Sequence, residues 1–498
     1  MILISRRLAL DVRAVFRRAL CLSHRGGLPP VHLEAGSNGL RIRCRTHDMA
    51  IEYQHPGEQS AANCWIPFEM LADVEGRRDE PVRIELQKNS VIASWQDGPV
   101  PCLVRHDRPE AKDHEKAFPA IPESFAENEP RLVRALADAM ETTDPNSSRY
   151  ALGCVQLQGE KGTIAATDGR QLLLESGFVF PWTEDLLLPG SSVFRSRELP
   201  DDTPVQVGKT DKWIVVRVGP WTFWSEADIE GRFPEIERHV PDARSAAASL
   251  EIHPSDAQFL VEHLPHLPGG ASFNEPVTLE LNGQAVVRAR SPDFSKPTEI
   301  VLARSACSGE PLRVNTNRRY LARAMALGFD AVHVTDPKSP VLSLDEHRRY
   351  VWAPLDPGSA LVATEDAVRI DSRDSRTGHN RKTRSRNPGR KERKPMPSVS
   401  SNTILPDSKG RNGSAASTST PPAGNGRPKR SSQEADTSGR ARPRELSELI
   451  SQAESVRASL RETLSQTASL LGALKQHSRK SKVVAAALAS LRELQPTP

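Results

Sequence analysis

The feature that most constrains this chain is a pattern that recurs three times at an interval of about 120 residues. Apolar residues lead into an expected helix start at residues 65–67, 188–190 and 314–316, and the reference positions 67, 189 and 315 lie 122 and 126 residues apart. Each place is followed by a segment that predicts an amphipathic helix, and then by a strand, a turn and a second strand. A repeat of this length is the size of a domain, because solenoid repeats usually span only about 20 to 50 residues.

The recurrence predicts an α+β fold with three similar domains. An earlier helix can be placed in each unit, at residues 10–22, 131–140 and 255–263, with further strands after it. At about 100 to 200 residues per domain, a chain of 498 residues has room for three such units and a tail. The expected domains are residues 1–122, 123–245 and 246–358.

The C-terminal part of the chain has a different composition. Residues 371–440 contain only four residues from the set Val, Ile, Leu, Met, Phe, Tyr and Trp, too few to offset the entropy lost on ordering. We therefore expect a disordered basic linker at residues 359–443. After it, apolar positions from Leu446 follow a spacing of three and four residues, which predicts an α-helical coiled coil at residues 444–495. A polar run interrupts this stripe, so a single long helix and a helical hairpin both fit.

The formal net charge of +4 is distributed unevenly. Residues 371–440 carry 16 Lys and Arg against 6 Asp and Glu, and residues 441–498 carry 9 against 5, so residues 1–370 carry about −10. An acidic body can still bind nucleic acid, because phosphate is attracted by Lys and Arg gathered on one face. The charge distribution therefore excludes only one mode of binding, in which residues 1–370 attract nucleic acid by their overall charge.

The sequence lacks the motifs of common enzyme classes. It has no GxxxxGK[ST] phosphate loop, no HExxH and no GxSxG. His47, Asp48 and Asp168 belong to no recognisable acid–base pair, and capping of turns is the expected role of both aspartates. The six cysteines show no CxxC pair and the 14 histidines are dispersed, so we expect no catalytic residue, metal site, cofactor or small-molecule substrate. No stretch approaches the roughly 20 apolar residues that cross a bilayer, and we expect no membrane contact.

Several segments together resemble the bacterial DNA polymerase III beta subunit family, the sliding clamps. Residues 163–174 (TIAATDGRQLLL), 231–241 (GRFPEIERHVP) and 314–342 occur in the order of the family's signature stretches, and residues 350–355 (YVWAPL) resemble its closing strand. The resemblance covers about residues 1–356 and is weakest in the first unit. It implies three clamp-type domains with helices lining a ring lumen and sheets outside. It also implies a head-to-tail homodimer around double-stranded DNA, with no catalysis of its own, in the bacterial cytoplasm at the nucleoid.

The resemblance places arginine-bearing helices in the lumen of such a ring. A ring that slides should offer Arg and Lys to phosphates without reading bases. The candidate DNA-binding residues are Arg13, Arg17, Arg18, Arg131, Arg134, Arg318, Arg319 and Arg323 on the expected helices, and Arg25 in a loop that resembles a DNA-contacting loop of the family.

Clamps of this family also hold linear peptides from the replicative polymerase, the clamp loader and repair factors in a groove between the second and third domains. Matched by motif position, the groove would be lined by Leu152, Thr167, Gly169, Arg170, Leu172, Pro234, Arg238, His239, Val351, Ala353, Pro354 and Leu355. Small and aliphatic residues would form the pocket, and the charged residues its rim. The alternatives are intramolecular salt bridges for Arg170 and Arg238, a packing role for His239, and a positive-φ turn for Gly169.

Two features depart from the family. The family often has a basic residue after the proline of the second unit, where this chain has Gly190 and Ser191, and the family chain ends soon after its closing strand, whereas about 140 residues follow here. The leading interpretation is a DNA sliding clamp, a processivity factor. The alternative is a clamp-like paralogue that acts as a DNA-associated interaction scaffold through its basic tail and coiled coil. A nuclease or nucleotidyl transferase would need a carboxylate cluster that the sequence does not display.

Overall fold

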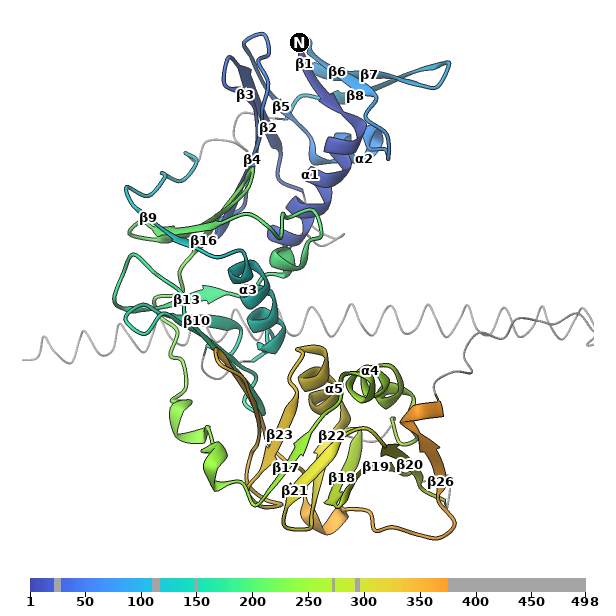
Figure 1. Ribbon diagram of the computed structural model, residues 1–498. Coiled ribbons are helices and arrows are strands. Elements are labelled where there is room, and N and C mark those ends of the chain that lie inside the picture. Colours follow the sequence, from blue (N-terminus) through green and yellow to red (C-terminus); the bar gives the residue numbers. More distant parts are fainter. Residues whose placement is uncertain (22–27, 110–116, 148–150, 271–273, 292–295, 375–498) are drawn as a thin grey trace, which may run out of the picture. The chain divides into compact units, whose positions relative to one another are not determined.

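The computed structural model describes residues 1–21, 28–109, 117–147, 151–270, 274–291 and 296–374 (Figure 1). The expected coiled coil at residues 444–495 and the expected linker from residue 375 onward lie outside this part of the chain. The described part is an α+β structure in which helices pack on mainly antiparallel sheets. A similar order of elements recurs three times along the chain.

The first repeat contains β1 (Ile2–Ser5), α1 (Arg6–Ala19), β2 (Val31–Gly36), β3 (Gly39–Arg45), β4 (Met49–His55), β5 (Ala62–Ile66), α2 (Phe68–Val74), β6 (Pro81–Leu86), β7 (Ser90–Asp97) and β8 (Val100–Asp107). The second contains β9 (Phe125–Asn128), α3 (Arg131–Thr142), β10 (Cys154–Gln158), β11 (Thr163–Thr167), β12 (Gln171–Ser176), β13 (Asp185–Pro189), β14 (Val205–Lys209), β15 (Trp213–Val218) and β16 (Trp221–Glu226). The third contains β17 (Ala248–Glu251), α4 (Pro254–His263), β18 (Pro276–Asn282), β19 (Gln284–Ala289), β20 (Thr298–Leu302), β21 (Ala306–Gly309), β22 (Leu312–Asn317), α5 (Arg318–Ala326), β23 (Ala331–Val334), β24 (Val341–Leu344) and β25 (Arg348–Trp352), and β26 (Val368–Asp371) follows it.

The second repeat shares one sheet with the first repeat and another with the third. The eight-stranded sheet, in the order β5-β2-β3-β4-β16-β15-β14-β9, joins the first and second repeats. The nine-stranded sheet, in the order β13-β10-β11-β12-β25-β24-β23-β17-β21, joins the second and third repeats. Two sheets remain, a four-stranded one with the order β1-β6-β7-β8 and a five-stranded one with the order β22-β18-β19-β20-β26. Neighbouring repeats are therefore joined by continuous backbone hydrogen bonding.

The helices follow local signals in the sequence. Ser5 caps α1 by accepting a hydrogen bond from the Leu8 N–H at 3.0 Å, and Asn317 caps α5 through its side-chain oxygen. Apolar residues at a helical spacing bury one face of α1, including Leu8 and Phe16. Figure 1 shows α1 and α2 together on the first repeat and α4 beside α5 on the third. Among the described residues, no helix has the length and apolar composition that crossing a bilayer requires.

The second repeat differs from the expected pattern after residue 190. Instead of a second amphipathic helix, it has a single 3₁₀ turn, Ser192–Arg195. Phe194 is already buried by this one turn. Pro200 limits the segment further, because the residue before a proline disfavours the helical conformation. The first and third repeats carry α2 and α5 at the equivalent place, as expected.

The ordered chain also continues past residue 358, where we expected the linker to begin. A 3₁₀ turn at Pro357–Ser359, strand β26 and a last 3₁₀ turn at Ser372–Asp374 lie beyond that boundary. β26 pairs in parallel with β20, and Ile370 packs on the core of the third repeat. This short segment forms a strand because an existing sheet edge satisfies its backbone groups, and composition alone does not reveal that edge.

Candidate functional site

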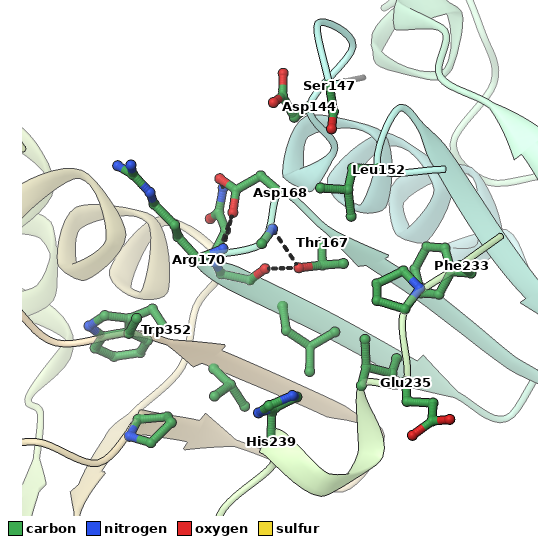
Figure 2. Close-up of a pocket in the computed structure, with 18 of the residues that line it drawn as sticks. Asp144, Ser147, Leu152, Thr167, Asp168, Arg170, Phe233, Glu235, His239 and Trp352 are labelled. Carbon is green, nitrogen blue, oxygen red and sulfur yellow. Dashed lines mark hydrogen bonds between the residues drawn. The ribbon is translucent and has the colours of Figure 1, made fainter. Parts of the chain in front are cut away.

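A pocket of about 870 Å³ lies where the second and third repeats share a sheet. Three segments surround it, namely the turn between β11 and β12, the loop at residues 232–239, and the end of β25. Figure 2 shows Phe233, Glu235 and His239 of the loop across the pocket from Thr167 and Asp168 of the turn. The pocket is lined by ten of the expected groove residues, which are Leu152, Thr167, Gly169, Arg170, Leu172, Pro234, Arg238, His239, Val351 and Ala353.

The turn between β11 and β12 is held by its own side chains. The Asp168 carboxylate accepts hydrogen bonds from the backbone N–H groups of Arg170 at 2.8 Å and Gln171 at 2.9 Å. The Thr167 hydroxyl accepts from the Gly169 N–H at 3.0 Å and donates to the Gln171 carbonyl at 2.6 Å. Gly169 has a φ of 87°, a conformation that glycine adopts without strain. The expected turn roles of Asp168 and Gly169 are therefore confirmed.

The floor of the pocket is made by the pairing of β12 with β25. Leu172 and Val351 are direct antiparallel partners in this pair, and they are 5% and 4% exposed. Ile236 and Leu342 join them in a separate apolar cluster beneath the pocket. The Ala353 N–H donates to the Arg170 carbonyl at 2.8 Å and extends the pairing to the pocket edge. The floor thus depends on two strands that come from different repeats.

Charged side chains form the rim. Arg170 is exposed and donates to the Asn274 side-chain oxygen at 2.9 Å. Arg238 lies 3.6 Å from Glu235, and its side chain is still 70% exposed. His239 is exposed, so it has no packing role within this part of the chain. An apolar floor with a polar rim is the arrangement of sites that hold peptides or small ligands.

Two expected groove residues, Pro354 and Leu355, do not line the pocket. The Leu355 N–H donates to the Asn315 carbonyl of β22 at 2.7 Å. The Asn315 amide in turn donates to the Asp356 carbonyl at 3.2 Å. These bonds turn the chain away from the pocket directly after Ala353 and towards the five-stranded sheet of the third repeat.

The pocket also includes residues that were not expected from the motif positions in the sequence. They are Asp144, Asn146, Ser147, Asp168, Gln171, Arg232, Phe233, Glu235, Ile236, Pro340 and Trp352. Phe233 and Ile236 lie in the GRFPEIERHVP segment, so this motif could have identified them as pocket residues. Asp144 and Pro340 belong to loops without such a motif, and only the fold brings them to the pocket.

The arginines expected to contact DNA differ in how far their side chains are buried. Arg318 is 1% exposed, and its guanidinium donates to the carbonyls of Glu275, Leu264, Leu267 and Pro268. Burial lowers the pKa of Arg318 from its usual value. A side chain enclosed by carbonyls is not available to phosphates, so Arg318 is a structural residue and does not fit the role we expected.

Three further arginines are held by intramolecular partners. Arg13 lies 2.7 Å from Glu75, with 24% of its side chain exposed. Arg131 lies 3.2 Å from Glu175 and stacks over the Phe178 ring. Arg323 of α5 donates to the Asp138 carbonyl at 2.6 Å and the Thr142 hydroxyl at 3.0 Å. Because both acceptors belong to α3, Arg323 links the second and third repeats.

The remaining helix arginines are more accessible. The side chains of Arg134 and Arg319 are 72% and 74% exposed, each beside one carboxylate. Arg18 is 42% exposed and lies 3.0 Å from Glu198, and Arg17 is half-buried. Arg25 lies outside the described residues. The exposed cations of α1, α3 and α5 are thus a smaller set than the sequence predicted.

Within residues 1–374 as described, no group of three or more His, Cys, Asp or Glu side chains is arranged to hold a metal ion. Burial raises the pKa of the Cys44 thiol to about 12 and that of Cys64 to about 11. Burial and the neighbouring Asp228 raise the pKa of Cys154, near the pocket, to about 12. These thiols are protonated at neutral pH and are poor nucleophiles.

Comparisons with known proteins agree at the level of the fold. No protein-family model matches the chain, and no curated protein matches it. Among solved structures, a sliding clamp (DNA polymerase III subunit beta) from Pseudomonas aeruginosa bound to griselimycin is 18% identical, with a TM-score of 0.60 over 71% of this chain and 98% of that chain. The beta subunit of a DNA polymerase from Streptococcus pyogenes is 17% identical, with a TM-score of 0.60 over 71% and 99%. A DNA polymerase sliding clamp from Bacillus subtilis is 17% identical, with a TM-score of 0.58 over 71% and 98%. The described part of the chain therefore has the fold of the DNA polymerase III beta subunit sliding clamps.

Proposed function

We propose that the chain is a DNA sliding clamp, a processivity factor that holds its partners through peptides bound in the pocket between the second and third repeats. The observation that carries this proposal is the pocket itself, with Leu172 and Val351 in its floor and charged residues at its rim. The proposed partners are the replicative polymerase, the clamp loader and repair factors. This role places the protein at the nucleoid in the bacterial cytoplasm.

The pocket has the physical properties that peptide capture needs. Burial of one large apolar side chain contributes about 1.5 to 3 kcal/mol, so each such anchor tightens the binding of a short peptide by about ten-fold or more. The exposed Arg170 and Arg238 can pair with acidic groups of the peptide at the rim. An anchored side chain with flanking polar contacts suits partners that exchange quickly.

The DNA-binding part of the proposal rests on the exposed helix arginines. Arg134 and Arg319 leave most of their side chains in solvent. Contacts of this kind attract phosphates in any sequence and are weakened by salt. A closed ring adds retention by topology, which does not depend on those contacts.

The scaffold alternative is favoured by one specific observation. Most of the arginines expected at DNA have intramolecular partners, and Arg318 is buried. In that alternative the three repeats only present the pocket, and the basic tail contacts DNA. Both functions use the same peptide site.

Retention on circular DNA tests the clamp against the scaffold. The full chain is loaded with its cognate clamp loader onto nicked circular duplex, washed at high salt, and compared before and after the circle is cut. A clamp remains on the circle and is lost after cutting, because only the topological link survives the salt wash. Equal loss from circular and linear DNA contradicts the clamp and supports the scaffold.

A further inference from the structure

The internal repetition of this fold defines how one repeat joins the next. In the first repeat, β4 pairs with β16, the last strand of the second repeat. In the second repeat, β12 pairs with β25, the last strand of the third repeat. Both pairings are antiparallel, and β4 and β12 occupy the same place in their repeats. The rule is that the fourth strand of one repeat pairs with the last strand of the following repeat.

The same rule leaves two strands without a repeat to join. The fourth strand of the third repeat is β20, and the last strand of the first repeat is β8. β8 is the edge of its four-stranded sheet, and it exposes Val100 at 56% and Leu103 at 64%. A long edge with exposed apolar side chains is a site for strand addition. The partner that fits both edges is a second copy of this chain, joined head to tail through β20 and β8.

In this chain, however, β20 already has a second neighbour. β26 pairs with four residues of β20, from Thr298 opposite Val368 to Val301 opposite Asp371. The Val368 N–H donates to the Pro297 carbonyl at 2.9 Å. The guanidinium of Arg369 lies 3.2 Å from the buried Glu299 carboxylate.

A buried anchor holds the end of β26. The Ser372 hydroxyl donates to the Asp256 carboxylate at 2.7 Å and accepts from the Ala303 N–H at 3.1 Å. Ser372 is 1% exposed and Asp256 is 0% exposed. Asp256 also accepts from the Arg304 N–H and the Ser305 hydroxyl. The segment that follows the closing strand is therefore built into the third repeat by specific contacts.

We propose that β26 is an intramolecular cap on the ring-forming edge, and that it competes with β8 of a second copy for β20. This inference rests on the proposed clamp function, because the competing strand is the one that closes the ring. With β26 in place, head-to-tail assembly is blocked, and release of β26 opens the edge. The exchange is energetically feasible because the cap is short and parallel, whereas the joins between repeats are antiparallel and slightly more stable per residue.

Two variants of the full chain have opposite effects on the cap: one fixes β26 on β20, and the other releases it. Thr298→Cys with Val368→Cys places two cysteines at partner positions of β20 and β26, so oxidation locks the cap in place. Ile370→Pro removes a backbone donor and an apolar contact from β26 and releases it. Ala363→Pro, in the exposed segment before β26, is the matched control for the proline. A further Val104→Pro on β8 reports whether any assembly uses that edge.

The measurement is the association constant from sedimentation velocity over a range of protein concentrations. We expect Ile370→Pro to strengthen association at least ten-fold over Ala363→Pro, and Val104→Pro to abolish the gain. We expect the oxidised double-cysteine protein to lose assembly that depends on β8 and to regain it on reduction. Association through residues 444–495 would be common to all variants and does not alter these differences.

Two results overturn the cap, and they differ in what they say about the clamp. If the oxidised, locked protein still assembles through β8, the cap is wrong and the ring stands. If neither Ile370→Pro nor the wild type assembles through β8 at any concentration, the result contradicts both the proposed cap and the proposed ring.

Discussion

Arg318 and Arg319 are neighbours at the start of α5, yet Arg318 is 1% exposed and the Arg319 side chain is 74% exposed. The buried guanidinium donates to the carbonyls of Leu264, Leu267, Pro268 and Glu275. The exposed one lies beside the Glu275 carboxylate. Two identical side chains in one helical turn thus have different tasks, one in the stability of the third repeat and one at its surface.

Replacement of Arg318 by Met should destabilise the protein. The substitution leaves several buried carbonyls without donors, at a cost of about 2 to 4 kcal/mol in the free energy of unfolding. Urea denaturation followed by tryptophan fluorescence measures this change. Arg319→Met is the matched control, and we expect it to change the free energy of unfolding by less than about 0.5 kcal/mol. Equal midpoints for the two variants would show that the carbonyls around Arg318 find other donors.

Replacement of both Arg134 and Arg319 by Gln should weaken binding to linear duplex DNA at low salt. The plot of log K against log salt has a negative slope, and each lost phosphate contact makes this slope shallower by about 0.9. Fluorescence anisotropy with a labelled duplex over a salt series gives that slope. Arg349→Gln, an exposed arginine on β25 away from the helices, should leave it unchanged. An unaltered slope in the double variant would exclude these two residues from the DNA contact.

Leu172→Asp should abolish binding of a polymerase-derived peptide with a leucine or aromatic anchor. A carboxylate in the apolar floor stays unpaired, and the lost burial of the anchor corresponds to a ten-fold or greater rise in Kd. Isothermal titration calorimetry checks this prediction. Because Leu172 also belongs to β12, the milder Leu152→Ala serves as a second variant, with an expected three- to ten-fold rise.

The control for the pocket is Val179→Asp, a 59% exposed residue that does not line it. It should bind the peptide as the wild type does. Full affinity in both pocket variants would remove the pocket as the partner site.

The buried thiols should resist alkylation in the folded protein. With a pKa of about 12 for Cys44 and Cys154, only about one thiol in ten thousand is ionised at pH 8. The exposed Cys21 and the half-exposed Cys102 should react with iodoacetamide before the buried thiols, as peptide mapping by mass spectrometry would show. The pKa of these thiols is raised on folding, so their contribution to stability is complete below about pH 9 and is lost as the pH rises towards 12. Rapid labelling of Cys154 at pH 8 would contradict its burial.

Local features were the ones that the sequence determined. The recurrence of helix, strand, turn and strand predicted three repeats, because hydrophobic spacing and helix caps act within a few residues. The turn of Asp168 and Gly169 was also predictable, since its hydrogen bonds join residues two or three positions apart. Position within the family motifs then placed ten of the twelve expected groove residues around one pocket.

Long-range pairing decided the rest. Leu172 and Val351 form one floor only because β12 finds β25 in a shared sheet, and Arg318 is buried only because distant carbonyls surround its side chain. β26 forms because β20 presents an edge and Asp256 accepts a hydrogen bond from Ser372, whereas the composition of the segment suggested a linker. Burial and strand partners are properties of what packs against a residue, and such neighbours are set by the tertiary structure and not by the residues adjacent in the chain.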